Sequence, residues 1–249
     1  MSNTILSLSH VTVRYGQMTA LRDASIHVDK GEVVCIIGPN GAGKSTMLAA
    51  AAGGAPVVSG NIQFNDKAIT GVAPEKIARL GISLVPEGRH VFGSLTVEEN
   101  LQIAGYIQKD SGQAKQDVER VLTYFPRLRE RLKFPAGRLS GGEQQMLAIG
   151  RALMTRAKLI MVDEPSLGLA PKIIDQIYQI LLDIRRTEGL TLLINEQSSN
   201  RILKHADRIY VLRGGVIQLE GRAADLADGE AIREAYFGFQ HSDSRETAQ

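Results

Sequence analysis

One glycine-rich segment constrains the fold of this chain more than any other. It comprises Gly38, Pro39, Asn40, Gly41, Ala42, Gly43, Lys44, Ser45 and Thr46. Residues 38–45 fit the pattern G-x-x-x-x-G-K-[ST], in which backbone N–H groups close around phosphate oxygens. An apolar run, 33–37, precedes the segment and an alanine-rich run, 47–52, follows it. The sequence therefore predicts a buried strand, a phosphate-binding loop and a helix whose positive end points at the anion.

Three side chains of this loop suit a nucleoside triphosphate with its Mg²⁺. Lys44 brings a full positive charge to the β- and γ-phosphates, the Ser45 hydroxyl can ligate Mg²⁺, and Thr46 adds a phosphate contact. We therefore expect ATP and Mg²⁺ as the cofactors. The alternative is a glycine-rich turn without a ligand, which the flanking strand and helix disfavour.

A second apolar run, 159–162, ends in the two carboxylates Asp163 and Glu164. A strand that is buried on both faces delivers the residues at its carboxyl end to the edge where α/β sheets bind ligands. There we expect Asp163 to hold Mg²⁺ through water, and Glu164 to orient and polarise an attacking water. A solvated acidic turn, or a helix N-cap near Pro165, is the alternative.

The hydrophobic pattern predicts an α/β fold. Residues 5–28 and 60–65 alternate apolar with polar residues, as antiparallel strands do, whereas 33–37, 159–162 and 192–194 are continuous apolar runs typical of parallel strands. Apolar residues at helical spacing follow Pro171, and others mark one helix over 118–128. We expect a mixed sheet core, an antiparallel β subdomain and a helical insertion without strands over 87–155.

Composition excludes several classes of protein. The 29 Lys and Arg residues nearly balance the 27 Asp and Glu residues, so a polybasic nucleic-acid binder is not expected. The single cysteine, Cys35, cannot form an internal disulfide, and its apolar neighbours predict a small buried side chain. We find no run of about 20 apolar residues and no signal-like N-terminus, so we expect a soluble chain whose membrane role depends on a partner.

A third motif lies between the loop and the carboxylates. It reads Leu-Ser-Gly-Gly-Glu-Gln-Gln over 139–145. Taken alone, Ser140 could simply cap a helix. In this order and approximate spacing, however, the motifs closely resemble those of ABC-type ATPases, and the resemblance extends over about residues 6–238.

The resemblance implies a P-loop fold of ABC type and a mechanism that needs two such domains paired head to tail. Ser140, Gly141 and Gly142 would contact the γ-phosphate held by the partner domain, so that ATP drives closure of the dimer. Tyr15 matches the position whose ring stacks on adenine, with an ordinary strand tyrosine as the alternative.

The resemblance also implies the organisation of the chain. The ATPase domain would cover 1–240, with the core and β subdomain in 1–86 and 156–240 and the helical subdomain in 87–155. The polar tail, 241–249, is expected to be flexible.

Three departures from the general pattern narrow the resemblance. Glu87 stands where most members have Gln, Gln197 takes the place of a switch His, and Ala170 replaces a loop Asp. At these three positions the chain resembles the short ATP-binding subunit of branched-chain (hydrophobic) amino acid importers. The motifs that match that subunit are 85–89, 96–101, 166–171 and 235–238. Residues 195–198 read Asn-Glu-Gln-Ser, whereas that subunit usually has Val-Glu-Gln-Asn.

The resemblance thus implies roles for the departing residues. Glu87 would lie near Mg²⁺ and phosphate, where it adds negative charge. Gln197 would still donate a hydrogen bond near the γ-phosphate, but it cannot carry the charge of a His. With Lys44 and Glu164, Gln197 completes the predicted catalytic set, and Ser45, Asp163 and Glu87 form the predicted metal set.

The implied partners are two permease subunits, a second and longer ATPase subunit, and indirectly a periplasmic or extracellular binding protein, with no nucleic acid. The implied location is the cytoplasmic side of the cell membrane, as a peripheral subunit. The alternatives are an ATPase for urea or amide import, one for lipid or lipopolysaccharide export, and an ABC ATPase that works without transport.

Overall fold

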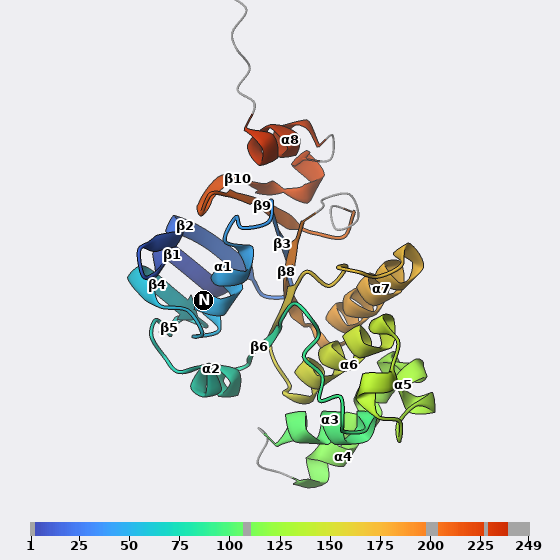
Figure 1. The fold of residues 1–249 in the computed structure, drawn as a ribbon. Helices are drawn as coiled ribbons and strands as arrows, with labels where there is room; N and C mark the ends of the chain where they lie inside the picture. Colours follow the sequence, from blue (N-terminus) through green and yellow to red (C-terminus); the bar gives the residue numbers. More distant parts are fainter. Residues whose placement is uncertain (1–2, 107–110, 198–203, 227–228, 239–249) are drawn as a thin grey trace, which may run out of the picture.

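A six-stranded sheet forms the centre of the molecule in the computed structural model, which describes residues 3–106, 111–197, 204–226 and 229–238 (Figure 1). Its strand order is β10-β9-β3-β8-β7-β6, and all neighbours are parallel except β10 and β9. The strands are β3 (Val33–Ile37), β6 (Ile82–Val85), β7 (Leu159–Asp163), β8 (Thr191–Glu196), β9 (Arg208–Arg213) and β10 (Val216–Arg222).

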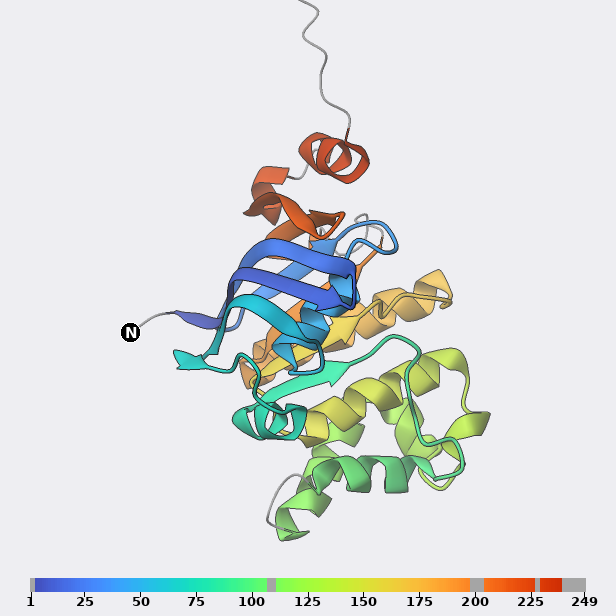
Figure 2. The ribbon, with the colours of Figure 1, turned by 60° about the vertical axis from the view of Figure 1, so that its left-hand side comes forward.

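A four-stranded antiparallel sheet with the order β2-β1-β4-β5 lies beside the first sheet (Figure 2). Its strands are β1 (Thr4–Tyr15), β2 (Met18–Asp29), β4 (Val57–Phe64) and β5 (Lys67–Ala68). Buried and exposed residues alternate along much of β2, because only one face of this sheet meets the core.

The six-stranded sheet separates two hydrophobic cores. Along β3, Val33, Cys35 and Ile37 face one core, whereas Val34 and Ile36 face the other. Successive side chains of a strand point to opposite faces, so a strand with both faces covered reads as a continuous apolar run. Cys35 is fully buried as predicted, and burial raises the pKa of its thiol well above the ordinary value.

Helices cover both faces of this sheet (Figure 1). The described α-helices are α1 (Lys44–Ala51), α2 (Pro74–Leu80), α3 (Val97–Gly105), α4 (Ser111–Tyr124), α5 (Pro126–Glu130), α6 (Gly141–Met154), α7 (Pro171–Glu188) and α8 (Glu230–Phe237). Short 3₁₀ turns occupy Ala136–Arg138 and Ala223–Leu226. The buried side of α1 joins the core shared with the antiparallel sheet, whereas α6 and α7 join the other core. Within the described ranges, no helix has both the length and the apolar character needed to cross a bilayer.

The predicted fold class is confirmed, with one local correction. The pattern over 118–128 predicts one helix, but α4 ends at Tyr124 and α5 begins at Pro126. Phe125 adopts a φ of −123° and a ψ of 70°, because the ring of the following proline disfavours helical geometry. The division of the chain at 87 and 156 stays a prediction, and the tail 241–249 lies outside the described residues.

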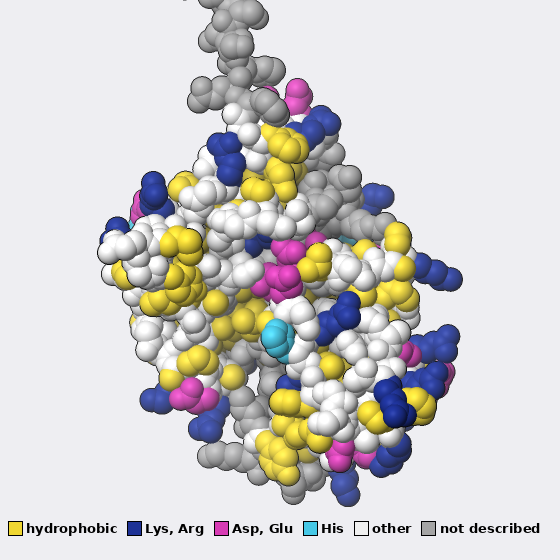
Figure 3. Space-filling view, in the orientation of Figure 1, with side chains coloured by type: hydrophobic (Ala, Val, Ile, Leu, Met, Phe, Trp, Pro, Cys, Tyr) yellow, Lys and Arg dark blue, Asp and Glu magenta, His cyan; other side chains and the backbone are white. Residues whose placement is uncertain are grey.

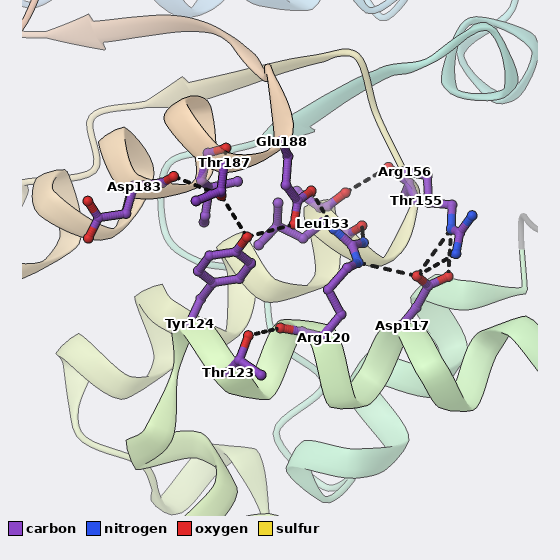
Figure 4. Close-up of polar contacts among 12 residues, drawn as sticks. Asp117, Arg120, Thr123, Tyr124, Leu153, Thr155, Arg156, Asp183, Thr187 and Glu188 are labelled. Carbon is purple, nitrogen blue, oxygen red and sulfur yellow. Dashed lines mark hydrogen bonds and ion pairs between the residues drawn. The ribbon is translucent and has the colours of Figure 1, made fainter.

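A polar network joins α4 to the carboxyl ends of α6 and α7 (Figure 4). The buried carboxylate of Asp117 accepts hydrogen bonds from Arg156, at 2.9 Å from Nε to Oδ2 and 3.0 Å from Nη2 to Oδ1. Arg120 also contacts Asp117, pairs with Glu188, and donates to the carbonyl oxygen of Leu153 at 2.8 Å. The network therefore fixes α4 against the segment that follows α6 and against the last turn of α7.

We expect Asp117→Asn to destabilise the protein, because the amide keeps the shape of the carboxylate but loses its charge and part of its acceptor capacity. Hydrogen bonds to charged groups contribute about 1.5–3 kcal/mol each, so the free energy of unfolding should fall by roughly that amount. Urea unfolding followed by circular dichroism measures it. The control is Glu130→Gln, which breaks the exposed pair of Glu130 with Arg127 and should change little. Equal losses in the two variants would contradict this prediction.

Candidate active site

The phosphate loop connects the carboxyl end of β3 to the first turn of α1. Gly43 caps α1 with a φ of 105°, in the left-handed region that favours glycine. A Cβ at Gly43 would lie 2.6 Å from the carbonyl oxygen of Ala20, and one at Gly38 would collide with the carbonyl oxygen of Leu212. Because both obstacles are backbone atoms, neither position accepts a larger residue without a shift of the chain.

Lys44 folds back over the loop that it follows. Its side chain is only 4% exposed, and its Nζ donates to the carbonyl oxygens of Gly38, at 2.8 Å, and Pro39, at 3.2 Å. The same nitrogen lies 3.1 Å from Oε1 of Glu164, so the two groups form a nearly buried ion pair. The structure thus brings together the cation and the carboxylate that the sequence predicts at a triphosphate.

A cleft of about 510 Å³ opens over this pair. Its lining includes Asn40, Gly41, Gly43, Lys44, Ser45 and Thr46 from the predicted loop, together with Glu87 and Glu164. Sequence reasoning missed the other lining residues, which are Met18, Thr19, Ala20, Leu167, Gly214 and Gly215. The Gly-Gly pair at 214–215 is a turn signal that could have drawn attention to this segment. In the view of Figure 3, acidic side chains gather near the middle of the molecule, and hydrophobic ones gather near α3.

Asp163 ends β7, and Glu164 follows it in a strained conformation. The Asp163 side chain is 6% exposed, and its Oδ1 accepts a hydrogen bond of 3.1 Å from Nδ2 of Asn195. Glu164 has a φ of 46°, which is uncommon for any residue except glycine. Its N–H donates to the carbonyl oxygen of Asn195 at 3.1 Å. This bond holds the strained turn, which swings the Glu164 side chain out of the strand and toward Lys44.

A further buried carboxylate, Glu196, lies at the end of β8. It accepts a hydrogen bond of 2.7 Å from Oγ of Ser166 and another from the hydroxyl of Tyr178. Burial raises the pKa of Glu196 above its ordinary value, while these hydrogen bonds act in the opposite direction. Glu196 therefore ties the loop after Glu164 to the segment that leads into Gln197.

The other predicted site residues lie at or near the same edge of the sheet. Glu87 follows β6 and Gln197 follows β8, and both are exposed. Gln197 does not line the cleft, whereas Glu87 does. Tyr15 is 43% exposed and pairs across a hairpin with Met18, which lines the cleft. The tyrosine is thus placed beside the cleft rather than in its lining.

Ser140, Gly141 and Gly142 stand apart from this cleft at the N-terminal end of α6. Ser140 caps the helix: its Oγ accepts a hydrogen bond from the N–H of Glu143, and its own N–H donates to Oε2 of Glu143 at 2.8 Å. A Cβ on Gly141 would lie 2.9 Å from the guanidinium of Arg89, so an arginine lies directly over the start of this helix. The helix cap is therefore present, and the cleft of the same chain is lined without these three residues.

Comparison with known proteins agrees with this arrangement. The family model described as ABC transporter matches residues 21–167. The branched-chain amino acid transport ATP-binding protein BraG of Pseudomonas aeruginosa is 49% identical over 94% of this chain and 100% of its own length. The probable branched-chain amino acid transport ATP-binding protein LivF of Archaeoglobus fulgidus is 38% identical over 90% of this chain and 94% of its own.

Solved structures give the same result for the fold. An ATP-binding cassette of an ABC transporter in its ADP conformation has a TM-score of 0.84 and 31% identity, covering 96% of this chain and 100% of that one. A nucleotide-free ATP-binding cassette has a TM-score of 0.83 and 31% identity, covering 93% of this chain and 98% of that one. The phosphate loop, the cleft over it and these relatives together show that the chain belongs to the ABC transporter family.

Proposed function

We propose that this chain is the ATP-hydrolysing subunit of a membrane importer of branched-chain or other hydrophobic amino acids. The observation that carries the proposal is the cleft in which the phosphate loop, Lys44 and Glu164 meet. The amino acid class is supported by the names of BraG and LivF, which match this chain over nearly their whole length.

In this proposal Lys44 changes partner when ATP binds. Its ammonium group pairs with Glu164 in the structure, and phosphate oxygens are stronger acceptors that bring more negative charge. The carboxylate of Glu164 is then free to accept a hydrogen bond from water and to take its proton as the water attacks the γ-phosphate. The N–H groups of the loop and the N-terminal end of α1 stabilise the charge on the phosphates.

Ser45 and Asp163 suit a Mg²⁺ ion bound together with the nucleotide. Both offer oxygen atoms, which this hard cation prefers, and Oδ2 of Asp163 accepts no hydrogen bond from any described residue. The described residues contain no group of three or more His, Cys, Asp or Glu side chains that could hold a metal alone. This fits Mg²⁺, which commonly binds through one or two carboxylates plus phosphates and neutralises phosphate charge. Glu87, which also lines the cleft, would add negative charge nearby.

We propose that the site is completed by a second ATPase subunit. Ser140, Gly141 and Gly142 lie at the start of a 14-residue helix, α6, whose N-terminal end favours an anion. Because the cleft of the same chain is lined without them, the anion would be the γ-phosphate in the partner's cleft. Tyr15 would stack on adenine, and Gln197 would donate a hydrogen bond to the γ-phosphate.

The remaining parts of the proposal concern the assembly. The partners would be two permease subunits, a second and longer ATPase subunit, and an external binding protein that delivers the substrate. The chain would lie at the cytoplasmic side of the membrane through its permeases. A urea or amide importer, a lipid or lipopolysaccharide exporter, and a non-transport ATPase are the other candidates.

Reconstitution with candidate permeases and a binding protein from the same organism tests the proposal. We expect ATP hydrolysis in proteoliposomes to rise several-fold when leucine, isoleucine or valine is added with the binding protein. Urea, short amides and lipopolysaccharide are the comparison substrates. Stimulation by one of these instead would favour the corresponding alternative, and failure to co-purify with any permease would favour the non-transport ATPase.

A further inference from the structure

Asn195 is a fully buried polar residue in the middle layer of the molecule. It belongs to β8 and has an exposed fraction of 0%. Its neighbours in register are Asp163 on β7 and Ile36 on β3, so it lies between two parallel strands in the centre of the sheet. Burying an amide in such a place costs free energy unless the amide is hydrogen-bonded, so the contacts of Asn195 need an explanation.

Asn195 contacts both Asp163, which ends β7, and the backbone of Glu164, which follows it. Its side-chain Nδ2 donates to Oδ1 of Asp163 at 3.1 Å, and its backbone carbonyl oxygen accepts from the N–H of Glu164 at 3.1 Å. The second bond would survive almost any substitution at 195, because it uses the backbone. The first bond depends on the amide side chain alone, and it acts only on Asp163.

The carbonyl end of the same amide lacks a partner in the described part of the chain. Oδ1 of Asn195 is buried and accepts no hydrogen bond from any residue that the structure describes. Turning the amide over would not help, because Oδ1 would then face a carboxylate oxygen of Asp163, and two acceptors repel. The orientation that bonds Asp163 therefore leaves a buried acceptor without a donor among the described residues, and a bound water could supply one.

We propose that Asn195 is a positioning residue for the Mg²⁺–nucleotide site. Its Nδ2 fixes the rotamer of Asp163, whose Oδ2 accepts no hydrogen bond from a described residue and would thus be held ready for the ion. The Oδ1 of Asn195 would accept a hydrogen bond from a water that binds with the ion. The inference rests on the proposed function, because it takes Asp163 as the residue that holds Mg²⁺. Groups that orient a ligand of a metal in this way commonly change metal affinity by about 10–100-fold when they are removed.

To test the inference, we would measure how tightly Asn195→Val binds a non-hydrolysable ATP analogue. Calorimetry gives the affinity once with Mg²⁺ and once with EDTA, and the two values are compared. Valine removes the amide and keeps the strand, since β-branched residues suit a buried strand. We expect the affinity in Mg²⁺ to fall about 10-fold, whereas the affinity in EDTA should stay within about twofold of that of the unchanged protein. A residue that merely supports the fold would lower both affinities together.

Thr191→Val is the matched control. Thr191 lies on the same strand and is equally buried, and its Oγ1 accepts a hydrogen bond of 3.0 Å from the N–H of Gly31, at the other end of β8. This variant also loses one buried hydrogen bond, but none to a carboxylate of the site. We expect it to lose stability as Asn195→Val does and to keep the full effect of Mg²⁺ on nucleotide affinity.

Asn195→Ser keeps the experiment decisive if the valine variant does not fold. Serine is smaller than asparagine, cannot collide with β3 or β7, and is too short to reach Asp163 as the amide does. The inference is overturned if a folded variant at 195 keeps the normal effect of Mg²⁺, or loses affinity equally in Mg²⁺ and EDTA. If the unchanged protein itself binds the analogue equally well in both, the proposed Mg²⁺ site is wrong, and not only the role of Asn195.

Discussion

A Glu164→Gln variant should bind ATP normally and hydrolyse it about 100-fold or more slowly than the unchanged protein, which is the usual contribution of a general base. Glutamine has nearly the same shape but cannot take a proton from water. It also removes the negative charge that lies 3.1 Å from Lys44 Nζ, so no carboxylate competes with the phosphates for this lysine. Because the variant binds ATP but does not hydrolyse it, the protein should accumulate as ATP-bound dimers.

Phosphate release measures the loss of hydrolysis, and size-exclusion chromatography with ATP and Mg²⁺ measures the dimer. Glu188→Gln is the matched control, since Glu188 is paired with an arginine, Arg120, but lies in the network at the end of α7. It should hydrolyse ATP at close to the normal rate. Normal hydrolysis by Glu164→Gln would show that the role assigned to Glu164 is wrong.

Lys44→Ala should lose most of its affinity for ATP. The substitution removes a charge-assisted contact to the phosphates, which contributes about 1.5–3 kcal/mol, or roughly 10–150-fold in the dissociation constant. It also leaves the side chain of Glu164, which is only 10% exposed, without its cation and facing the incoming phosphates. We therefore expect a loss at the upper end of this range, together with a lower melting temperature of the nucleotide-free protein.

Equilibrium binding of a fluorescent ATP analogue measures this effect. In the double variant Lys44→Ala/Glu164→Gln, the unpaired carboxylate is absent, and part of the lost affinity should return. Lys76→Ala, which removes an exposed lysine on α2, should bind ATP normally. If Lys44→Ala bound ATP as tightly as Lys76→Ala does, the loop would not hold the phosphates in the proposed way.

The extent to which the fold follows from the sequence differs from element to element. The continuous apolar runs located β3, β7 and β8 within a residue or two, because most positions of a strand covered on both faces are apolar. The short strand β6 and the hairpin of β9 and β10 were not singled out. The side chains of β10 are half-buried or exposed, because this strand lies at the edge of the sheet. Pro126 divided one expected helix into two, which periodicity alone did not reveal.

By itself, the sequence determined the phosphate loop, the carboxylates at the end of a buried strand, and the family to which both belong. These features are local, since spacing along the chain fixes which backbone and side-chain groups face one ligand. Only the tertiary structure decided that Lys44 pairs with Glu164 and that Asn195 contacts Asp163. The second contact depends on the register in which β7 and β8 lie side by side, and a shift by one residue would turn Asn195 away from the site. Register is set by packing across the whole sheet, which no short motif contains.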